Sequence, residues 1–313
     1  MKILITGGCG YKGSFLIPLL LKKGYEIINI DTQWFGNHLP NHKNLENIKA
    51  DIRDIRLELF DGINSIIHLA NIANDPAVDL NPTLSWEVNV LASKQLADNA
   101  LKANVKQILY ASSGSVYGIK KEEKVTEDLD LIPISVYNKT KMVAERVFYS
   151  YKNELKIHCI RPATVCGLSP RMRLDVSVNL LTYQALKNKK ITVLGGSQTR
   201  PNIHLKDMAG VYEHFLENPQ IESGFYNAGF ENISILDIAK LIQSKIDCEI
   251  EIKDSNDPRS YRLDSSKLLK TGFSPNSNIE EAIDEIIVSF QNGKLADREQ
   301  WHTVKWMKSQ NFE

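Results

Sequence analysis

Hydrophobic and polar positions in the first half of the chain form short apolar runs separated by longer amphipathic stretches. The stretches near residues 12–23, 83–103 and 136–152 repeat their apolar positions at helical spacing. Strands and helices alternating in this way predict an α/β fold with a doubly wound parallel sheet and right-handed crossovers. The runs expected to form buried strands are KILIT (2–6), EIINID (26–31), NSIIHLA (64–70), QILYASS (107–113) and KIHCIRPA (156–163).

The rhythm changes after about residue 165, where the elements become shorter. We expect helices near 176–188, 205–217, 234–246 and 279–293, and a strand at ITVLG (191–195). No repeats or low-complexity linkers separate the two halves. The pattern predicts a first domain over residues 1–165 and a smaller mixed α/β lobe over residues 166–313, with an interleaved boundary between them.

Composition excludes several classes of function. The formal net charge is +0, which gives no electrostatic case for binding nucleic acid or an anionic membrane surface. The four cysteines and seven histidines show no spacing typical of a disulfide scaffold or a metal site. The apolar run FLIPLLL is far shorter than the roughly 20 residues of a membrane span, and we expect no signal peptide before the first strand. We expect a cytoplasmic protein without a metal.

A glycine-rich segment, KILITGGCGYKG, joins the first strand to the first helix. Gly7, Gly10 and Gly13 permit a tight turn and a close approach of the backbone to a pyrophosphate. The N-terminus of the following helix supplies N–H groups and the positive end of its dipole. Because the strand before and the helix after are both expected, the segment predicts a Rossmann-type dinucleotide site.

Two acidic residues that follow the second strand indicate which dinucleotide binds. Asp31 ends the second strand, where a carboxylate can accept hydrogen bonds from the adenosine ribose hydroxyls. A carboxylate there would repel a 2′-phosphate, which favours NAD over NADP. Asp51 and Ile52 are placed to reach the adenine, although Asp51 is equally explained as the N-cap of a helix.

Three tyrosines precede a lysine by four residues, and a catalytic one must lie beside the nicotinamide, at the carboxyl ends of the central strands. Ser113 stands at the end of such a strand, and Tyr137 with Lys141 projects from one face of the helix that follows. Tyr117 lies in a turn, where it can line a pocket but is poorly placed to share a helical face with its lysine. The three pairs are Tyr117 and Lys121, Tyr137 and Lys141, and Tyr183 and Lys187.

The chemistry favours the trio of Ser113, Tyr137 and Lys141, whereas packing is the expected role of Tyr183. A phenol with a pKa near 10 is a poor base at neutral pH. A lysine ammonium and an oxidised nicotinamide nearby both favour the phenolate. A serine hydroxyl can share the hydrogen bond of the substrate while a proton and a hydride leave it.

In this order, these residues resemble the extended short-chain dehydrogenase/reductase family, in its nucleotide-sugar epimerase/dehydratase branch. The resemblance covers nearly the whole chain. It implies NAD as cofactor, with Tyr11, Lys12, Leu69 and Ala70 beside it, and a nucleotide-diphosphate sugar as substrate. The segments that carry it are TGGCGYKG (6–13), HLAN (68–71), WEVNV (86–90), SSGSVYG (112–118), YNKTK (137–141), IRPATVCG (160–167) and TRPNIHLKDMA (199–209).

Two departures from the branch concern individual positions. Lys12 replaces the usual apolar residue and is expected to add charge near the phosphates. Thr164 stands where many members have an asparagine that contacts the substrate, which puts that contact in doubt, although Thr164 remains a candidate for the sugar site.

The residues after Ser113 bear on the reaction. Dehydratases and decarboxylases of the branch carry an acidic residue there, whereas this chain has Gly114 and Ser115. We therefore expect redox chemistry at C4 of the sugar, as a 4-epimerase or a 4-dehydrogenase, and we expect Ser115 to contact the substrate. A 4,6-dehydratase is disfavoured. A non-catalytic NAD-sensing regulator on the same fold is a further alternative, and such proteins usually lack the Tyr–Lys pair.

Arginines are expected to clamp the sugar diphosphate. Arg200 is the first candidate and Arg259 the second, with Arg262 behind it, although a surface salt bridge explains any one of them. The two arginines of SPRMR (169–173) stand at the expected sugar-nucleotide entrance, where a solvated loop explains them equally well.

Two narrower expectations come from resemblance alone. The segment NDPAVDLNP (74–82) is similar to sugar-nucleotide enzymes of bacterial capsule and lipopolysaccharide clusters, including NAD-dependent enzymes that oxidise C4 of GDP-manno-heptose. The family also implies a homodimer, formed through the helices near 83–103 and 136–152. The alternative is that the same faces pack inside one subunit.

Overall fold

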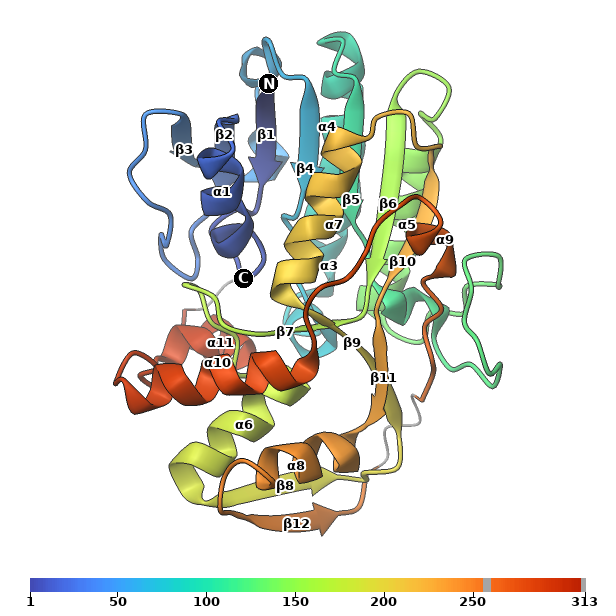
Figure 1. Cartoon of the computed structure of the whole chain (residues 1–313). Helices are drawn as coiled ribbons and strands as arrows, with labels where there is room; N and C mark the ends of the chain where they lie inside the picture. Colours follow the sequence, from blue (N-terminus) through green and yellow to red (C-terminus); the bar gives the residue numbers. More distant parts are fainter. Residues whose placement is uncertain (256–259, 311–313) are drawn as a thin grey trace.

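A seven-stranded parallel sheet forms the centre of the larger part of the molecule (Figure 1). The computed structural model describes residues 1–255 and 260–310. In spatial order the strands are β10 (Gly224–Ala228), β6 (Lys156–Pro162), β5 (Gln107–Ala111), β4 (Ser65–His68), β1 (Lys2–Thr6), β2 (Glu26–Asp31) and β3 (Leu45–Lys49). Each neighbouring pair is parallel. The predicted doubly wound parallel sheet is therefore confirmed, and its order reverses between β1 and β4, where ligands bind in such sheets.

Helices cover both faces of this sheet (Figure 1). On one face, α1 (Gly13–Lys22) and α7 (Leu205–Glu217) share an apolar core with Ile3 and Ile5 of β1. On the other, α3 (Pro82–Trp86), α4 (Ala92–Lys102) and α5 (Val136–Tyr149) pack with Leu4. Successive residues of one strand point to opposite faces, so the apolar run of β1 serves both cores.

The second lobe contains two small sheets and three long helices. β11 (Glu231–Ser234), β9 (Thr199–His204) and β7 (Thr164–Cys166) form one sheet, and β12 (Glu249–Lys253) pairs with β8 (Lys190–Leu194) in the other. α6 (Ser177–Asn188), α8 (Ile235–Gln243) and α10 (Ile279–Gln291) complete it. Shorter elements of the chain are α2 (Asp75–Val78), α9 (Ser266–Leu269), α11 (Thr303–Ser309), the 3₁₀ turns at 52–54, 57–60, 114–117 and 299–301, and a π turn at 87–91.

The chain crosses between the two lobes more than once. β10 and α7 follow residue 165, yet β10 pairs with β6 and α7 packs against α1. The lobes are thus interleaved in sequence, and the division at residue 165 stays a prediction. Within residues 1–255 and 260–310, no helix is long and apolar enough to cross a membrane.

Sequence patterns missed two strands of the main sheet and one local irregularity. β3 is a half-exposed edge strand whose sequence, LENIK, is mostly polar. β10, GFYNA, is short and begins with glycine, so it shows no apolar run. The helix expected over 83–103 is interrupted by the π turn, which contains Asn89. The Asn89 amide accepts from the N–H of Ile72 at 2.9 Å and donates to Thr140 Oγ1 at 3.1 Å, so it ties the turn to two neighbouring elements.

Candidate active site

A cavity of about 720 Å³ lies at the carboxyl ends of the central strands and is lined by residues of both lobes. Most of the predicted site residues line it. Arg262 is the exception among the described candidates, since it is exposed and does not line the cavity, and Arg259 lies outside the described residues. The lining residues predicted from sequence are Gly7, Gly10, Tyr11, Lys12, Gly13, Asp31, Asp51, Ile52, Leu69, Ala70, Ser113, Ser115, Tyr137, Lys141, Thr164 and Arg200. The fold thus brings the motifs together, while the role of each residue remains a prediction.

The glycine loop fits the space between β1, β4 and α1 only because it lacks side chains. Gly7 has a φ of +75°, and a Cβ there would lie 2.5 Å from the backbone nitrogen of Ala70. A Cβ on Gly13 would lie 2.4 Å from the Cα of Gly8. The loop therefore brings its backbone and the N-terminus of α1 to the cavity wall, as binding of a pyrophosphate requires.

Asp31 and Asp51 are held by backbone N–H groups at the cavity wall. The Asp31 carboxylate accepts from Cys9 N at 2.9 Å and from Gln33 N at 2.6 Å. Burial raises its pKa, and these two hydrogen bonds offset part of the rise. Asp51 accepts from Arg53 N at 2.8 Å as the N-cap of a 3₁₀ turn. The capping alternative is thus confirmed for Asp51, and contact with adenine stays a prediction.

The catalytic candidates meet where β5 ends and α5 begins. Ser135 caps α5 by accepting from Asn138 N at 3.1 Å, which fixes the start of the helix. One turn inside, Lys141 Nζ donates to the carbonyl of Ala111, the last residue of β5, at 2.6 Å. Ser113 lies just beyond that strand end, close enough to the Tyr137 hydroxyl to lower the pKa of the phenol. The trio therefore shares one corner of the cavity.

Burial favours the uncharged form of both titratable members of the trio. It raises the pKa of Tyr137 to about 12, against the hydrogen bond of Ser113 and the charge of Arg173, which both lower it. Burial, followed by repulsion from Lys12, lowers the pKa of Lys141 well below its usual range. A ligand that brings negative charge beside the lysines and positive charge beside the phenol would shift both groups toward their ionised forms.

The other two tyrosines serve packing. Tyr117 is fully buried; its hydroxyl accepts from Arg161 Nη1 and donates to Asn227 Oδ1, each at 2.8 Å. It is not among the described residues that line the cavity. Tyr183 is buried and packs edge-on against Phe290. These placements agree with the choice of Tyr137.

Two further parts of the cavity wall differ in how far the sequence indicated them. Arg171 and Arg173, the two arginines of SPRMR, line the cavity, and Arg171 is only 3% exposed, so the solvated-loop explanation is wrong for it. Arg173 is paired with Asp175 through bonds of 2.8 and 3.0 Å. Thr303 and Met307 of α11 also line the cavity, although the C-terminal segment showed no sign of chemistry in its sequence.

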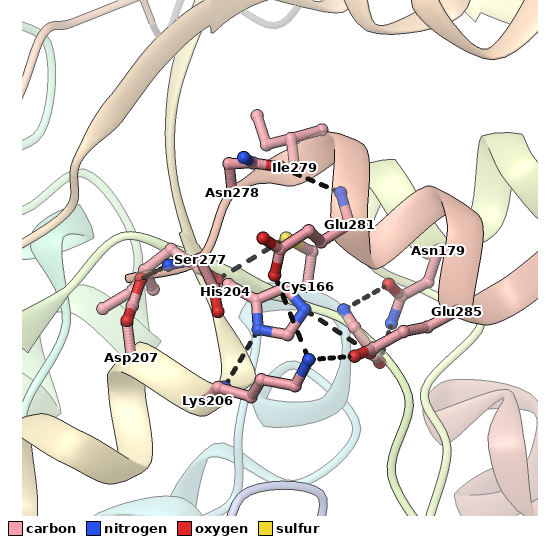
Figure 2. Close-up of polar contacts among 12 residues, drawn as sticks. Cys166, Asn179, His204, Lys206, Asp207, Ser277, Asn278, Ile279, Glu281 and Glu285 are labelled. Atoms are coloured by element: carbon pink, nitrogen blue, oxygen red, sulfur yellow. Dashed lines mark hydrogen bonds and ion pairs between the residues drawn. The ribbon is translucent and has the colours of Figure 1, made fainter. Parts of the chain in front are cut away.

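The later part of the TRPNIHLKDMA element, from His204 on, joins α10 through side-chain contacts (Figure 2). His204 Nε2 lies 3.4 Å from a carboxylate oxygen of Glu285 on α10, and Lys206 Nζ lies 2.5 Å from the other oxygen. The ring of His204 also accepts from the N–H of Lys206 at 3.1 Å, which caps α7. Next to this cluster, Asn179 Oδ1 accepts from Gly167 N at 3.0 Å. The histidine thus holds helices in place.

The parallel sheet with a glycine loop at its switch point, and the Ser–Tyr–Lys corner, are features of the short-chain dehydrogenase/reductase class of proteins. The model of the NAD dependent epimerase/dehydratase family matches residues 3–229. The chain belongs to this family, which confirms the resemblance recognised in its sequence and NAD as its cofactor.

Similar proteins act on nucleotide sugars. The chain is 31% identical over 288 residues to an uncharacterized UDP-glucose epimerase, YtcB, of Bacillus subtilis, covering 85% of this chain and 90% of that protein. It is 28% identical to UDP-glucuronic acid decarboxylase 1 of Danio rerio, over 92% of this chain and 72% of that protein. The crystal structure of UDP-glucuronic acid 4-epimerase from Bacillus cereus, in complex with UDP-glucuronic acid and NAD, superposes with a TM-score of 0.81 at 28% identity, over 92% and 99% of the two chains.

The residues present fit NAD. The glycine loop and the N-terminus of α1 suit a pyrophosphate, Asp31 suits ribose hydroxyls, and Tyr137 and Lys141 line the same cavity. NAD supplies the acceptor for a hydride. The chain supplies the positions of the groups that move protons.

Proposed function

We propose that the protein oxidises and reduces C4 of a nucleotide-diphosphate sugar, with Tyr137 as the base and a 4-epimerase as the preferred reaction. The observation that carries this proposal is the corner formed by Ser113, Tyr137 and Lys141 in the same cavity as the glycine loop. Tyr137 accepts the proton of the C4 hydroxyl, Ser113 donates a hydrogen bond to the same oxygen, and Lys141 stabilises the phenolate.

The residues after Ser113 support redox chemistry over loss of water or carbon dioxide. Gly114 and Ser115 have no group that can protonate a leaving hydroxyl, and the Ser115 hydroxyl instead hydrogen-bonds Ser113 at 2.8 Å. Likeness to a decarboxylase, a UDP-glucose epimerase and a 4-epimerase does not by itself decide between these reactions. A 4-dehydrogenase, which would release its keto sugar, is the second candidate.

Arg200 is the candidate for binding the sugar diphosphate. It lies on β9 at the cavity wall, on the side of the second lobe. Thr164 lies on β7, the strand next to β9 in the same small sheet, and also lines the cavity. A guanidinium binds phosphate oxygens in a bidentate manner, which suits this position. We propose UDP as the first nucleotide to test, because the relatives named above act on UDP-sugars. A GDP-linked heptose of bacterial surface polysaccharide synthesis is the narrower alternative.

The deciding experiment follows NADH absorbance with near-stoichiometric protein, NAD and a panel of UDP-, GDP- and dTDP-linked hexoses and heptoses. Conversion of one sugar to its C4 epimer without a lasting rise supports the epimerase. A lasting rise with a 4-keto product supports the dehydrogenase. If no sugar in the panel reacts while NAD still binds, the protein is better described as the NAD-sensing regulator.

We also propose a homodimer formed through α3, α4 and α5. Trp86, Leu91 and Leu101 of the π-interrupted helix are exposed, and Leu91 is 64% exposed. Exposed apolar side chains along these helices favour a second copy as the partner. Light scattering at micromolar concentration should give twice the chain mass of 35.4 kDa. The Leu91→Asp variant should have the mass of a single chain. A monomeric mass for the unmodified protein would contradict the proposal.

A further inference from the structure

A buried arginine in the cavity wall has a donor without a partner. Arg171 is 97% buried, since only 3% of it is exposed, and its Nε–H has no hydrogen-bond acceptor. The rest of the guanidinium is held in place: Nη2 donates to Thr303 Oγ1 at 3.2 Å, and Cζ lies 4.1 Å from the centre of the Phe35 ring. A buried, fixed and unsatisfied charged donor is costly unless a ligand satisfies it.

The surroundings of Arg171 indicate which ligand would do so. The backbone N–H of Arg171 donates to Ser14 Oγ, in the first turn of α1, at 3.3 Å. Asp31 is close enough to act electrostatically on the guanidinium. Arg171 therefore lies between the N-terminus of α1, which suits a pyrophosphate, and the carboxylate that suits the adenosine ribose.

The C-terminal segment holds this arginine from the outside. Thr303 and Met307 of α11 are buried and line the cavity. Trp306 Nε1 donates to the carbonyl of Trp34, after β2, at 2.7 Å. The carbonyl of Trp301 accepts from Leu174 N at 2.9 Å, three residues beyond Arg171. The segment is thus attached both to the NAD-binding sheet and to the loop that carries the arginine.

We propose that Arg171, oriented by Thr303, binds the pyrophosphate of NAD, and that α11 closes the adenosine half of the cofactor site. This inference rests on the family's use of NAD and extends the proposed function to a contact made from the second lobe. Burial, followed by repulsion from Arg173, lowers the pKa of Arg171 to about 9. A dianionic pyrophosphate beside the guanidinium would offset that cost.

The test uses binding of cofactor fragments, measured by calorimetry on the full chain. ADP-ribose carries the pyrophosphate, whereas adenosine carries only the base and ribose. Arg171→Gln should weaken ADP-ribose about 10- to 100-fold, the range for a lost charge-assisted hydrogen bond, and leave adenosine within about threefold. Thr303→Val, which keeps the shape of the side chain, should weaken ADP-ribose by a smaller factor. Arg56→Gln, at an exposed arginine that does not line the cavity, is the matched control.

Several outcomes would overturn the inference. Equal weakening of adenosine and ADP-ribose would mean that Arg171 acts through Asp31 or through folding, and unchanged ADP-ribose affinity would mean that it serves packing alone. A wild-type protein that does not bind ADP-ribose would also overturn it. If no sugar reacts in the absorbance experiment, only the proposed reaction is overturned, because the titrations with ADP-ribose and adenosine need no turnover.

Discussion

The two walls of the cavity differ in how far apart their residues lie in the chain. The strand-end wall comes from consecutive strand–helix units of one sheet. It is made by the glycine loop, Asp31, Ser113 and the start of α5. The lobe wall comes from separate segments of the second lobe and the C-terminus. Its residues are Thr164, Arg171, Arg173, Arg200 and the two residues of α11. The first wall has groups that fit the reaction, and the second has cations that fit phosphates.

A shared fold constrains the two walls unequally. A parallel sheet places every strand end at one edge, so chemistry there follows from topology. The lobe wall depends on how loops and a terminal helix pack, which a family can vary without disturbing the sheet. Differences in substrate and in cofactor retention are therefore expected from the lobe wall.

The largest expected effect comes from the strand-end wall. Tyr137→Phe removes the proton acceptor and should lower kcat about 1000-fold, within the usual contribution of acid–base catalysis, while NAD affinity stays the same. Tyr149→Phe, on the same helix but outside the cavity, is the control. Steady-state rates with the reactive sugar measure the effect. If Tyr137→Phe leaves kcat unchanged, Tyr137 is not the catalytic base.

The next effect concerns the choice of cofactor. Asp31→Asn removes the negative charge that would repel a 2′-phosphate, while the nearby Arg171 keeps its positive charge. NAD affinity should fall about 10-fold, and the preference for NAD over NADP should narrow or reverse. Titrations with both dinucleotides measure this, with Asp61→Asn, at an exposed position, as the control. If the variant prefers NAD over NADP as strongly as the unmodified protein, the Asp31 carboxylate does not determine the choice of cofactor.

A pH dependence should connect the two walls. Burial, followed by repulsion from Arg173, lowers the pKa of Lys12 to about 8. The pyrophosphate binds the charged form, so NAD affinity should be constant below pH 8 and fall by up to about tenfold per pH unit above it. Lys12→Met should weaken binding and flatten this profile, whereas Lys22→Met, at an exposed position of α1, should leave it intact. If NAD affinity falls with pH equally steeply in the Lys12 variant, a group other than Lys12 causes the pH dependence.

The smallest effect is expected outside the cavity. Burial raises the pKa of Glu285, but contacts with His204 and Lys206 outweigh this and lower it to about 2. The ionised carboxylate therefore stabilises the fold fully above about pH 4.5, and this stability is lost as the pH falls toward 2. Glu285→Gln should cost about 1 kcal/mol at pH 7 and less near pH 3, measured by urea unfolding, without changing NAD affinity. A change in affinity would extend the cofactor site to α10.

Much of the strand-end wall could be predicted because each motif needs only its own strand and helix. Gly7 must accommodate Ala70, and Tyr137 follows from the strand that ends before Ser113, so local patterns identify both positions. Arg171 could be noticed but not placed, because its location depends on Thr303, far along the chain. The sequence of α11 gives no sign of its position, since the residues that face the cavity, Thr303 and Met307, are ordinary packing residues.

The interleaved sheet has a consequence for how this protein is made. β10 covers the free edge of β6, but it is synthesised only after the whole segment between Pro162 and Gly224. Until then, β6 pairs with β5 alone, and its other edge is unpaired, which is the kind of edge that recruits other chains. Cutting the chain at residue 165 should therefore yield aggregates, so the protein can be divided into useful fragments only if the β10 strand is supplied as well.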